Sequence, residues 1–125
     1  MSAGVALQTA LVGALEQVGG LTGIYDGPPT RASFPYLVVD AGSELDWSHK
    51  SGAGREVLVA ITVWVDQPSR LRTMPDKIER AVSGVSKIGG WALVSLRFSR
   101  KRVLRDTAGP WAMALDFRAR LLKSA

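Results

Sequence analysis

The 125-residue sequence contains no cysteine and a single histidine, His49. Without thiols, the chain can form neither a disulfide nor a cysteine-ligated zinc or iron–sulfur centre. An acid–base or nucleophilic site needs paired groups whose environments separate their pKa values, and one isolated imidazole provides no such pair. We therefore expect no catalytic residue, and we expect that the protein is not an enzyme.

Motifs for phosphate and calcium binding are also missing. The segment Gly52-Ala53-Gly54 lacks the lysine and the helix start of a phosphate-binding loop. Asp40, Glu44 and Asp46 lie within seven residues, but they lack the ligand spacing and the turn of a calcium loop. We interpret these acids as a solvated edge and expect no metal and no cofactor.

No segment of the sequence is suited to a membrane. The apolar stretch Val5–Leu21 is interrupted by Gln8, Glu16 and Gln17, and the first basic residue is Arg31. Such a stretch is too polar and short to span a bilayer and lacks the basic start of a secretory signal. We expect a soluble protein without membrane contact, folded in the bacterial cytoplasm.

The composition is that of an ordinary globular protein, with 46% hydrophobic and 22% charged residues. The length suits one compact domain, and no repeat or linker divides the chain. We expect one domain over residues 1–125, with a mobile, polar loop at about 42–54.

Charge is distributed unevenly along the chain. Residues 1–62 contain three Lys/Arg and six Asp/Glu, for a net charge of −3, whereas residues 63–125 contain thirteen and five, for +8. This polarity suits either nucleic acid or stacking onto partners of alternating charge.

Hydrophobic periodicity predicts two helices. The first carries apolar residues at three- and four-residue spacing (Leu7, Leu11, Ala14, Leu15, Val18) and ends at Gly19-Gly20. The second covers roughly Ser69–Ser83. Thr73 and Asp76 resemble a capping box, so this helix starts either near Ser69 or near Thr73.

Alternation of apolar and polar residues predicts four strands. They are Phe34–Asp40, Arg55–Asp66, Trp91–Arg105 with a bulge between Phe98 and Val103, and Trp111–Leu121, with a turn at 106–110 before the last. A short extended piece, Ile24–Pro29, runs into a turn. The order α-β-β-α-β-β favours an α+β fold, in which an antiparallel sheet of four or slightly more strands has both helices on one face.

The densest cluster of like charge lies in the third strand. Arg97, Arg100, Lys101, Arg102 and Arg105 are five cations in nine residues, with no acid among them. They form either a solvated strand face or a contact with phosphates or an acidic partner. Aromatics for base stacking are scarce, because the alternation of Phe98 with Val94 and Leu96 predicts that Phe98 lies in the core.

Trp47 is the other unusual residue, because it is a large apolar group with little apolar cover nearby in the polar segment 42–54. Its side chain either folds back onto the domain or anchors a partner, since tryptophan is enriched at interface hot spots. The other tryptophans, Trp64, Trp91 and Trp111, lie in predicted strands and are interpreted as packing residues.

With these segments in place, the chain resembles the tail-completion or tail-terminator proteins of long-tailed phages and phage-like gene transfer agents. Five pieces carry the resemblance in order: the leading helix; Ile24-Tyr25-Asp26-Gly27-Pro28-Pro29; Phe34-Pro35-Tyr36-Leu37-Val38-Val39; Asp46-Trp47-Ser48 with Lys50, Gly52, Gly54 and Glu56, leading to Val63-Trp64; and Leu96-Arg97-Phe98 with Val103-Leu104-Arg105-Asp106 and Gly109. Together they span nearly the whole chain.

The resemblance implies a structural virion protein that forms a homo-oligomeric ring, a hexamer, on the head-proximal end of the tail tube. Such a ring ends tube polymerisation and contacts the tail tube protein and the head–tail connector or stopper protein, with DNA passing non-specifically through its lumen. The family supplies no catalytic residues.

From the exposure and charge that the sequence suggests, we infer two candidate surfaces for contact with partners. We assign partner or inter-subunit contacts to Trp47, Ser48, His49, Lys50 and Arg55. We assign lumen or acidic-partner contacts to Arg97, Arg100, Lys101, Arg102 and Arg105.

Two other functions fit the same sequence. The chain is alternatively another connector ring of the same particle, either a head–tail stopper or a tube subunit. It is alternatively a small DNA-binding module that uses the hairpin Arg97–Arg105 as a β-ribbon.

Overall fold

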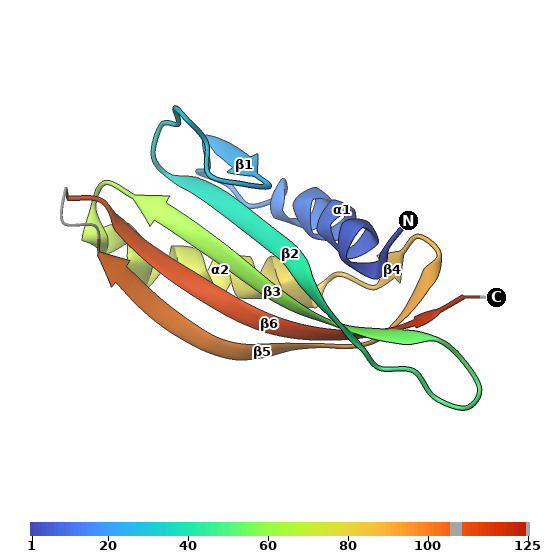
Figure 1. Cartoon of the computed structure of the whole chain (residues 1–125). Helices are drawn as coiled ribbons and strands as arrows, with labels where there is room; N and C mark the ends of the chain where they lie inside the picture. The colour runs from blue at the N-terminus through green and yellow to red at the C-terminus, as the bar shows by residue number, and fades with distance from the viewer. Residues whose placement is uncertain (106–108, 125) are drawn as a thin grey trace.

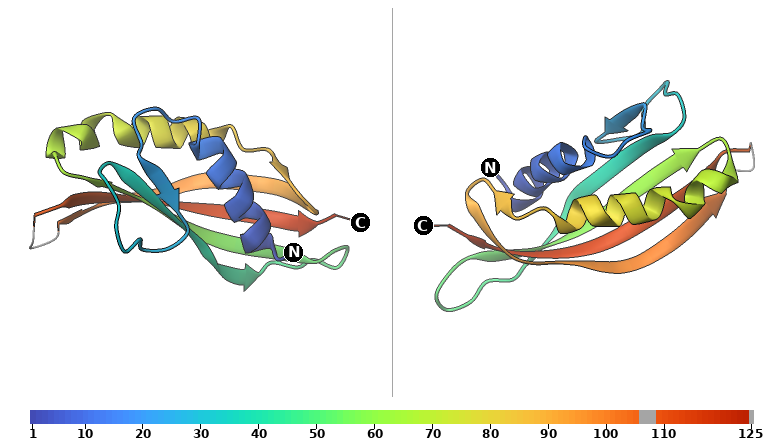
Figure 2. Two further views of the ribbon diagram at one scale, coloured as in Figure 1. Left: turned by 90° about the horizontal axis from the view of Figure 1, so that it is seen from above. Right: turned by 180° about the vertical axis from the view of Figure 1, so that it is seen from behind.

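The structure, a computed structural model, describes residues 1–105 and 109–124. Its elements in chain order are α1 (Ala3–Leu15), β1 (Gly23–Tyr25), β2 (Tyr36–Asp46), β3 (Gly54–Val65), the 3₁₀ helix η1 (Pro68–Arg72), α2 (Met74–Ser83), β4 (Lys87–Ile88), β5 (Trp91–Arg105) and β6 (Trp111–Lys123). A long, twisted sheet curls around the two helices (Figure 1, Figure 2).

The strands form one six-stranded sheet in the order β1-β2-β3-β6-β5-β4. β1 pairs parallel with β2, and the other neighbours pair antiparallel. β3 and β6 occupy the centre of the sheet, and β6 inserts between β3 and β5. This order places β2, from the acidic half of the chain, and β5, from the basic half, on opposite sides of the sheet.

The predicted fold class was wrong in several respects. The sheet is mixed rather than antiparallel, because β1 pairs parallel with β2. It has six strands, where four or slightly more were predicted. The observed order is α-β-β-β-α-β-β-β. The helices do not form a simple layer on one flat face, since the sheet curls around them and α1 also contacts α2 (Figure 2).

The core lies between the helices and the inner face of the sheet, the face that the helices cover. On β3, the alternation seen in the sequence is reproduced in space, because Val57, Val59, Ile61, Val63 and Val65 are all buried. β6 adds Met113, Leu115, Phe117, Ala119 and Leu121, and the helices add Leu7, Leu11, Leu15, Ile78 and Val82. Burial of these apolar side chains is the main stabilising contribution.

Both helices are shorter than the apolar pattern suggests. The Ser2 hydroxyl caps α1 by accepting a hydrogen bond from the Val5 amide at 3.1 Å, and the helix ends at Leu15, before Val18. The predicted second helix divides into η1 and α2, and α2 starts at Met74 with Pro75 in its first turn. Thr73 makes no side-chain capping bond, so the capping-box prediction was wrong.

The segment 42–54, predicted as a loop, is mostly a hairpin. β2 continues through a bulge between Asp40 and Ser43 to Asp46, which pairs with Arg55 of β3. Only residues 47–53 connect the strands. The last third of β2 is mostly polar and lacks the alternation of apolar and polar residues that indicates a strand, so the sequence did not predict it.

The long C-terminal hairpin matches its prediction more closely. A register shift between Phe98 and Arg100 confirms the predicted bulge, and a second shift separates Leu93 from Ser95. The predicted turn at 106–110 includes Asp106–Ala108, which lie outside the described residues.

Candidate partner-binding surfaces

The tip of the β2–β3 hairpin carries the first set of candidate residues. Two backbone hydrogen bonds join His49 and Gly52 in both directions, and the Trp47 amide donates to the Gly54 carbonyl at 3.0 Å. A Cβ on Gly54 would lie 2.3 Å from the Trp47 carbonyl oxygen, so this close approach requires glycine. The tip is therefore a closed turn with defined backbone contacts.

Trp47 folds back toward the outer face of the sheet, the face that the helices do not cover. Its ring lies 4.5 Å from the His49 ring and 5.4 Å from the Arg120 guanidinium on β6. Arg120 in turn donates to Glu56 at 2.9 Å. Trp47 remains partly exposed, so a partner can still reach part of the indole.

A short polar network fixes the base of the same hairpin. Ser48 donates to the Asp46 carboxylate at 2.6 Å and accepts from the Gly54 amide, while Arg55 contacts Asp46 at 3.2 Å. The Ser48 hydrogen bond is the main cause that lowers the pKa of Asp46, and the nearby Arg55 contributes to the same shift. The structure thus brings Trp47, Ser48, His49 and Arg55 together, and it leaves Lys50 exposed at the tip.

The second set of candidates, the basic run, lies on β5. Arg100 and Arg102 both donate to Asp116 of β6, with nitrogen–oxygen distances of 2.7 Å and 3.0 Å. Burial raises the pKa of Asp116, but the hydrogen bonds from Arg102 and Arg100 outweigh it and hold that pKa below its ordinary value. The Arg105 guanidinium lies 4.7 Å from the Trp111 ring.

The predicted core face of β5 was partly wrong. Val94 and Phe98 are 51% and 47% exposed, whereas Leu96 packs against the core. Val94 lies at the register shift between Leu93 and Ser95, and Phe98 contacts Phe117 edge-to-face beside an open side of the sheet. Periodicity alone cannot reveal this exposure, because it reports which face a residue shares and not whether anything covers that face.

An aromatic cluster on the outer face was not predicted from the sequence. The Tyr36 ring stacks between Phe34 and Trp64, at centroid distances of 5.7 Å and 6.4 Å, and meets Tyr25 edge-on. Burial, and to a lesser degree the nearby Tyr25, raises the pKa of Tyr36. Trp64 therefore packs outside the main core, whereas Trp91 and Trp111 pack against it.

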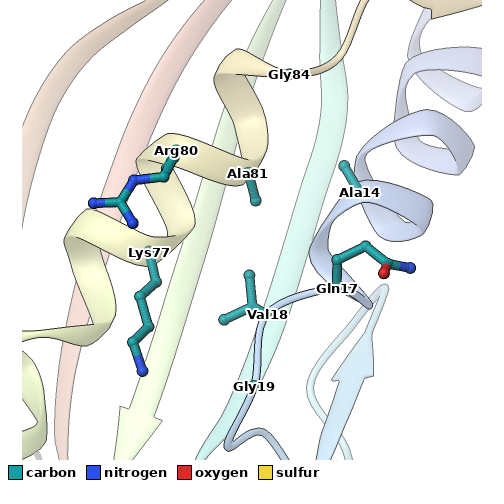
Figure 3. A pocket seen from close by; sticks show the side chains of 8 residues that line it. All are labelled: Ala14, Gln17, Val18, Gly19, Lys77, Arg80, Ala81 and Gly84. Atoms are coloured by element: carbon teal, nitrogen blue, oxygen red, sulfur yellow. The ribbon is translucent and has the colours of Figure 1, made fainter.

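A pocket separates the C-terminal end of α1 from α2. Ala14, Val18 and Ala81 form its apolar part, and Lys77 and Arg80 project from α2 beside it (Figure 3). Among the described residues that line this pocket, the charged ones are Lys77 and Arg80, both basic.

Two further findings concern the described residues only. Within 1–105 and 109–124, no group of three His, Cys, Asp or Glu side chains converges as a metal site would require. In the same part of the chain, neither helix is long and apolar enough to cross a membrane.

Comparisons with known proteins identify the family of the chain. Residues 5–122 match the family described as "Tail completion protein gp17". The chain belongs to this family of structural phage tail proteins, so the predicted resemblance is confirmed. A search of curated proteins found no match.

Two solved structures share the fold. A chain of the structure titled "Virion of native gene transfer agent (GTA) particle" is 25% identical, with a TM-score of 0.82 and coverage of 94% of this chain and 96% of that one. The structure titled "Structure of bacteriophage SPP1 gp17 protein" is 20% identical, with a TM-score of 0.58 and coverage of 98% and 91%. The protein is accordingly a tail completion protein of a phage-type particle.

Proposed function

We propose that the chain is the tail terminator of its particle. It forms a homo-oligomeric ring, a hexamer, that caps the head-proximal end of the tail tube and joins it to the head connector. The family match over residues 5–122 carries this proposal, because it covers almost the entire fold rather than one motif. The near-complete coverage of the chain from the gene transfer agent virion, in both directions, supports it.

A ring needs two different complementary surfaces on every subunit, because its contacts are heterologous. The sheet order supports this requirement, since the acidic strand β2 and the basic strand β5 lie on opposite sides of β3 and β6. The hairpin tip with Trp47, Ser48, His49, Lys50 and Arg55 is proposed as a further contact with a neighbouring subunit, the tail tube protein or the connector.

Contact with DNA in the lumen is proposed to be weak and non-specific. β5 carries five cations, but Asp116 accepts hydrogen bonds from two of them, Arg100 and Arg102. Neutralisation by Asp116 reduces the counterion release that drives DNA binding. Strong binding by a monomer, which the DNA-binding alternative requires, is therefore disfavoured.

The proposed role is structural and not enzymatic. The subunit would be synthesised in the bacterial cytoplasm, fold as one domain, and enter the virion at the head–tail junction. A stopper ring and a tube subunit are the alternatives. The particles that a strain lacking the protein assembles distinguish them from a terminator.

Deletion of the gene tests the proposal directly. A terminator stops tube polymerisation and provides the head-binding surface, so its loss should give filled heads without tails and free tails of irregular length in negative-stain micrographs. Complementation in trans should restore joined particles. Joined particles of normal length in the deletion strain would contradict the proposal, and absence of all tubes would favour a tube subunit.

DNA binding by the purified protein provides a second test. A gel-shift titration at two salt concentrations, with light scattering in parallel, should show weak binding by the free subunit. Nanomolar, strongly salt-dependent binding by a monomer would contradict the terminator proposal and support a DNA-binding module.

A further inference from the structure

The strands on either side of the central pair β3 and β6 carry opposite charge. β2 contains three acids, Asp40, Glu44 and Asp46, and no basic residue. β5 contains five cations and no acid. Because β3 and β6 separate them, this segregation arises from the sheet order and not from neighbours in the chain.

The side of β5 that faces away from β6 is an open edge. β4 pairs only with Trp91 and Ala92, and no other described strand pairs with β5 on that side. The stretch Leu93–Arg105 therefore presents unpaired backbone groups along most of a long strand (Figure 1). Such an edge is a template for strand addition.

The edge of β2 is open only at its end. β1 pairs with β2 as far as Val38, and the Gln8 side chain then donates to the Val39 carbonyl at 2.9 Å. Gly4 of α1 lies directly over the Ala41 carbonyl. Beyond this cover, Gly42–Asp46 extends past the end of α1 in the protruding hairpin, with its outer side unpaired among the described strands (Figure 1).

We propose that the basic edge of β5 in one copy of the chain, Leu93–Arg105, pairs with the acidic edge of β2, Gly42–Asp46, in a second copy. The inference deepens the proposed ring and rests on it. Repetition of this contact joins subunits head to tail, as a closed ring requires.

Charge selects this pairing over its alternatives. Two β5 edges would bring like charges together, and so would two β2 edges, which disfavours symmetric dimers. Arg97 and Lys101 are the most available cations. Within the described part of the chain neither forms an ion pair, and neither lies over an aromatic ring as Arg105 does over Trp111. Exposed Phe98 and Val103 add apolar surface that a paired strand would cover.

The strand directions are compatible with one continuous sheet. β2 is antiparallel to β3, β3 to β6, and β6 to β5, so β2 and β5 run in opposite directions within one subunit. If the sheet continues into the next copy, its β2 lies antiparallel to β5. Antiparallel pairing is the slightly more stable arrangement per residue.

Charge reversal on each edge separately tests the contact. The first variant combines Arg97→Glu with Lys101→Glu, and the second combines Asp40→Lys with Asp46→Lys. Glu44 stays unchanged because its carboxylate accepts a hydrogen bond from the Gly4 amide and so ties the strand to α1. Asp40 and Asp46 also accept hydrogen bonds, but their partners Gly42, Ser48 and Arg55 lie in the same hairpin. Each variant alone should raise the dissociation constant of assembly at least about tenfold, measured by sedimentation velocity and light scattering.

An equimolar mixture of the two variants should restore assembly. The reversed β5 positions 97 and 101 of the first variant then face the reversed β2 positions 40 and 46 of the second, and the natural β5 of the second variant faces the natural β2 of the first. Arg70→Glu with Arg72→Glu in η1 is the matched control for the β5 variant, with the same charge change outside both edges, and should assemble normally. Circular dichroism checks folding. If the β5 reversal unfolds, Arg97→Gln with Lys101→Gln replaces it, and if the β2 reversal unfolds, Asp40→Asn with Asp46→Asn replaces it. Either substitute should weaken assembly to a smaller degree.

The possible outcomes separate the two proposals. Unchanged rings from both variants, or no recovery in the mixture, would overturn the edge contact and leave the terminator proposal intact. A natural chain that stays monomeric both alone and on purified tails would overturn both. Hydrogen exchange should also slow at Leu93–Arg105 and Gly42–Asp46 on assembly, and unchanged exchange in an assembled ring would exclude strand pairing.

Discussion

The two faces of the central strands differ in what their side chains contact. On the inner face, Ile61 of β3 and Leu115 of β6 are fully buried against the helices. On the outer face, the same strands carry Leu58, which is 42% exposed, and Asp116, which binds two arginines. The inner face therefore holds the subunit together, and we expect partners to contact the outer face and the sheet edges.

The largest effect is expected from a cavity in the inner face. Leu115→Ala should lower the free energy of unfolding by about 2–5 kcal/mol, because it removes a fully buried side chain from the central strand β6. Urea denaturation, monitored by circular dichroism, measures this change in the free energy of unfolding. The matched outer-face variant Leu58→Ala should cost less than about 1 kcal/mol. Equal losses would remove the distinction between the faces.

The next largest loss of stability is expected from a substitution at the contact between α1 and the sheet. A Cβ at Gly4 would lie 2.5 Å from the Ala41 carbonyl oxygen, so Gly4→Val should lower the free energy of unfolding by about 1–3 kcal/mol.

Gly13 in the same helix provides the control, because a Cβ there meets no atom within 4 Å. Gly13→Ala should raise the midpoint of thermal unfolding slightly, since alanine is favoured over glycine in helices by about 0.5–1 kcal/mol. A Gly4→Val variant as stable as the natural chain would show that α1 does not depend on this close approach.

On the outer face, the ion pairs of Asp116 should make stability dependent on pH. The folded-state pKa of Asp116 is lowered from 3.8, so its contribution is present above pH 3.8 and is lost as pH falls through the folded-state pKa.

Asp116→Asn should therefore cost about 1 kcal/mol at pH 7 and progressively less in acid, since the arginine partners are partly exposed. Denaturation curves at a series of pH values measure the difference between the two proteins. A difference that does not shrink in acid would show that Asp116 acts through packing and not through charge.

The smallest effect on stability is expected at the hairpin tip. Trp47→Ala should leave the subunit folded, with a loss of about 1 kcal/mol or less. Among the described residues, its ring meets His49 and Arg120 as aromatic and cationic partners, and it stays partly exposed. Assembly should weaken measurably in light scattering. Unfolding in circular dichroism would instead make Trp47 a core residue and remove it as a partner anchor.

Local pattern was a good guide where one face of a strand is fully covered. The alternation of β3 and β6 predicted their inner faces correctly, because both strands have neighbours on two sides and helices above them. It was a poor guide on β5, where Phe98 follows the same alternation and is nevertheless half exposed. Strand position within a sheet depends on contacts between distant segments, which local sequence does not record.

The candidate residues show the same limit. The sequence indicated the basic run and Trp47 as unusual, but it gave no signal that Asp116 binds Arg100 and Arg102 from the adjacent strand. The aromatic cluster was also missed, since Tyr25, Tyr36 and Trp64 are separated in the chain and meet only when β1, β2 and β3 align.

By itself, the sequence determined the family, the absence of thiol chemistry, the helix near the N-terminus and the two-residue period of the main strands. These properties depend on residue type and local spacing. Only the tertiary structure decided that β1 adds a parallel strand, that β6 lies between β3 and β5, and that acidic and basic strands lie on opposite sides. The physical reason is that sheet order follows from which segments bury their apolar faces together, a condition that the whole chain satisfies at once.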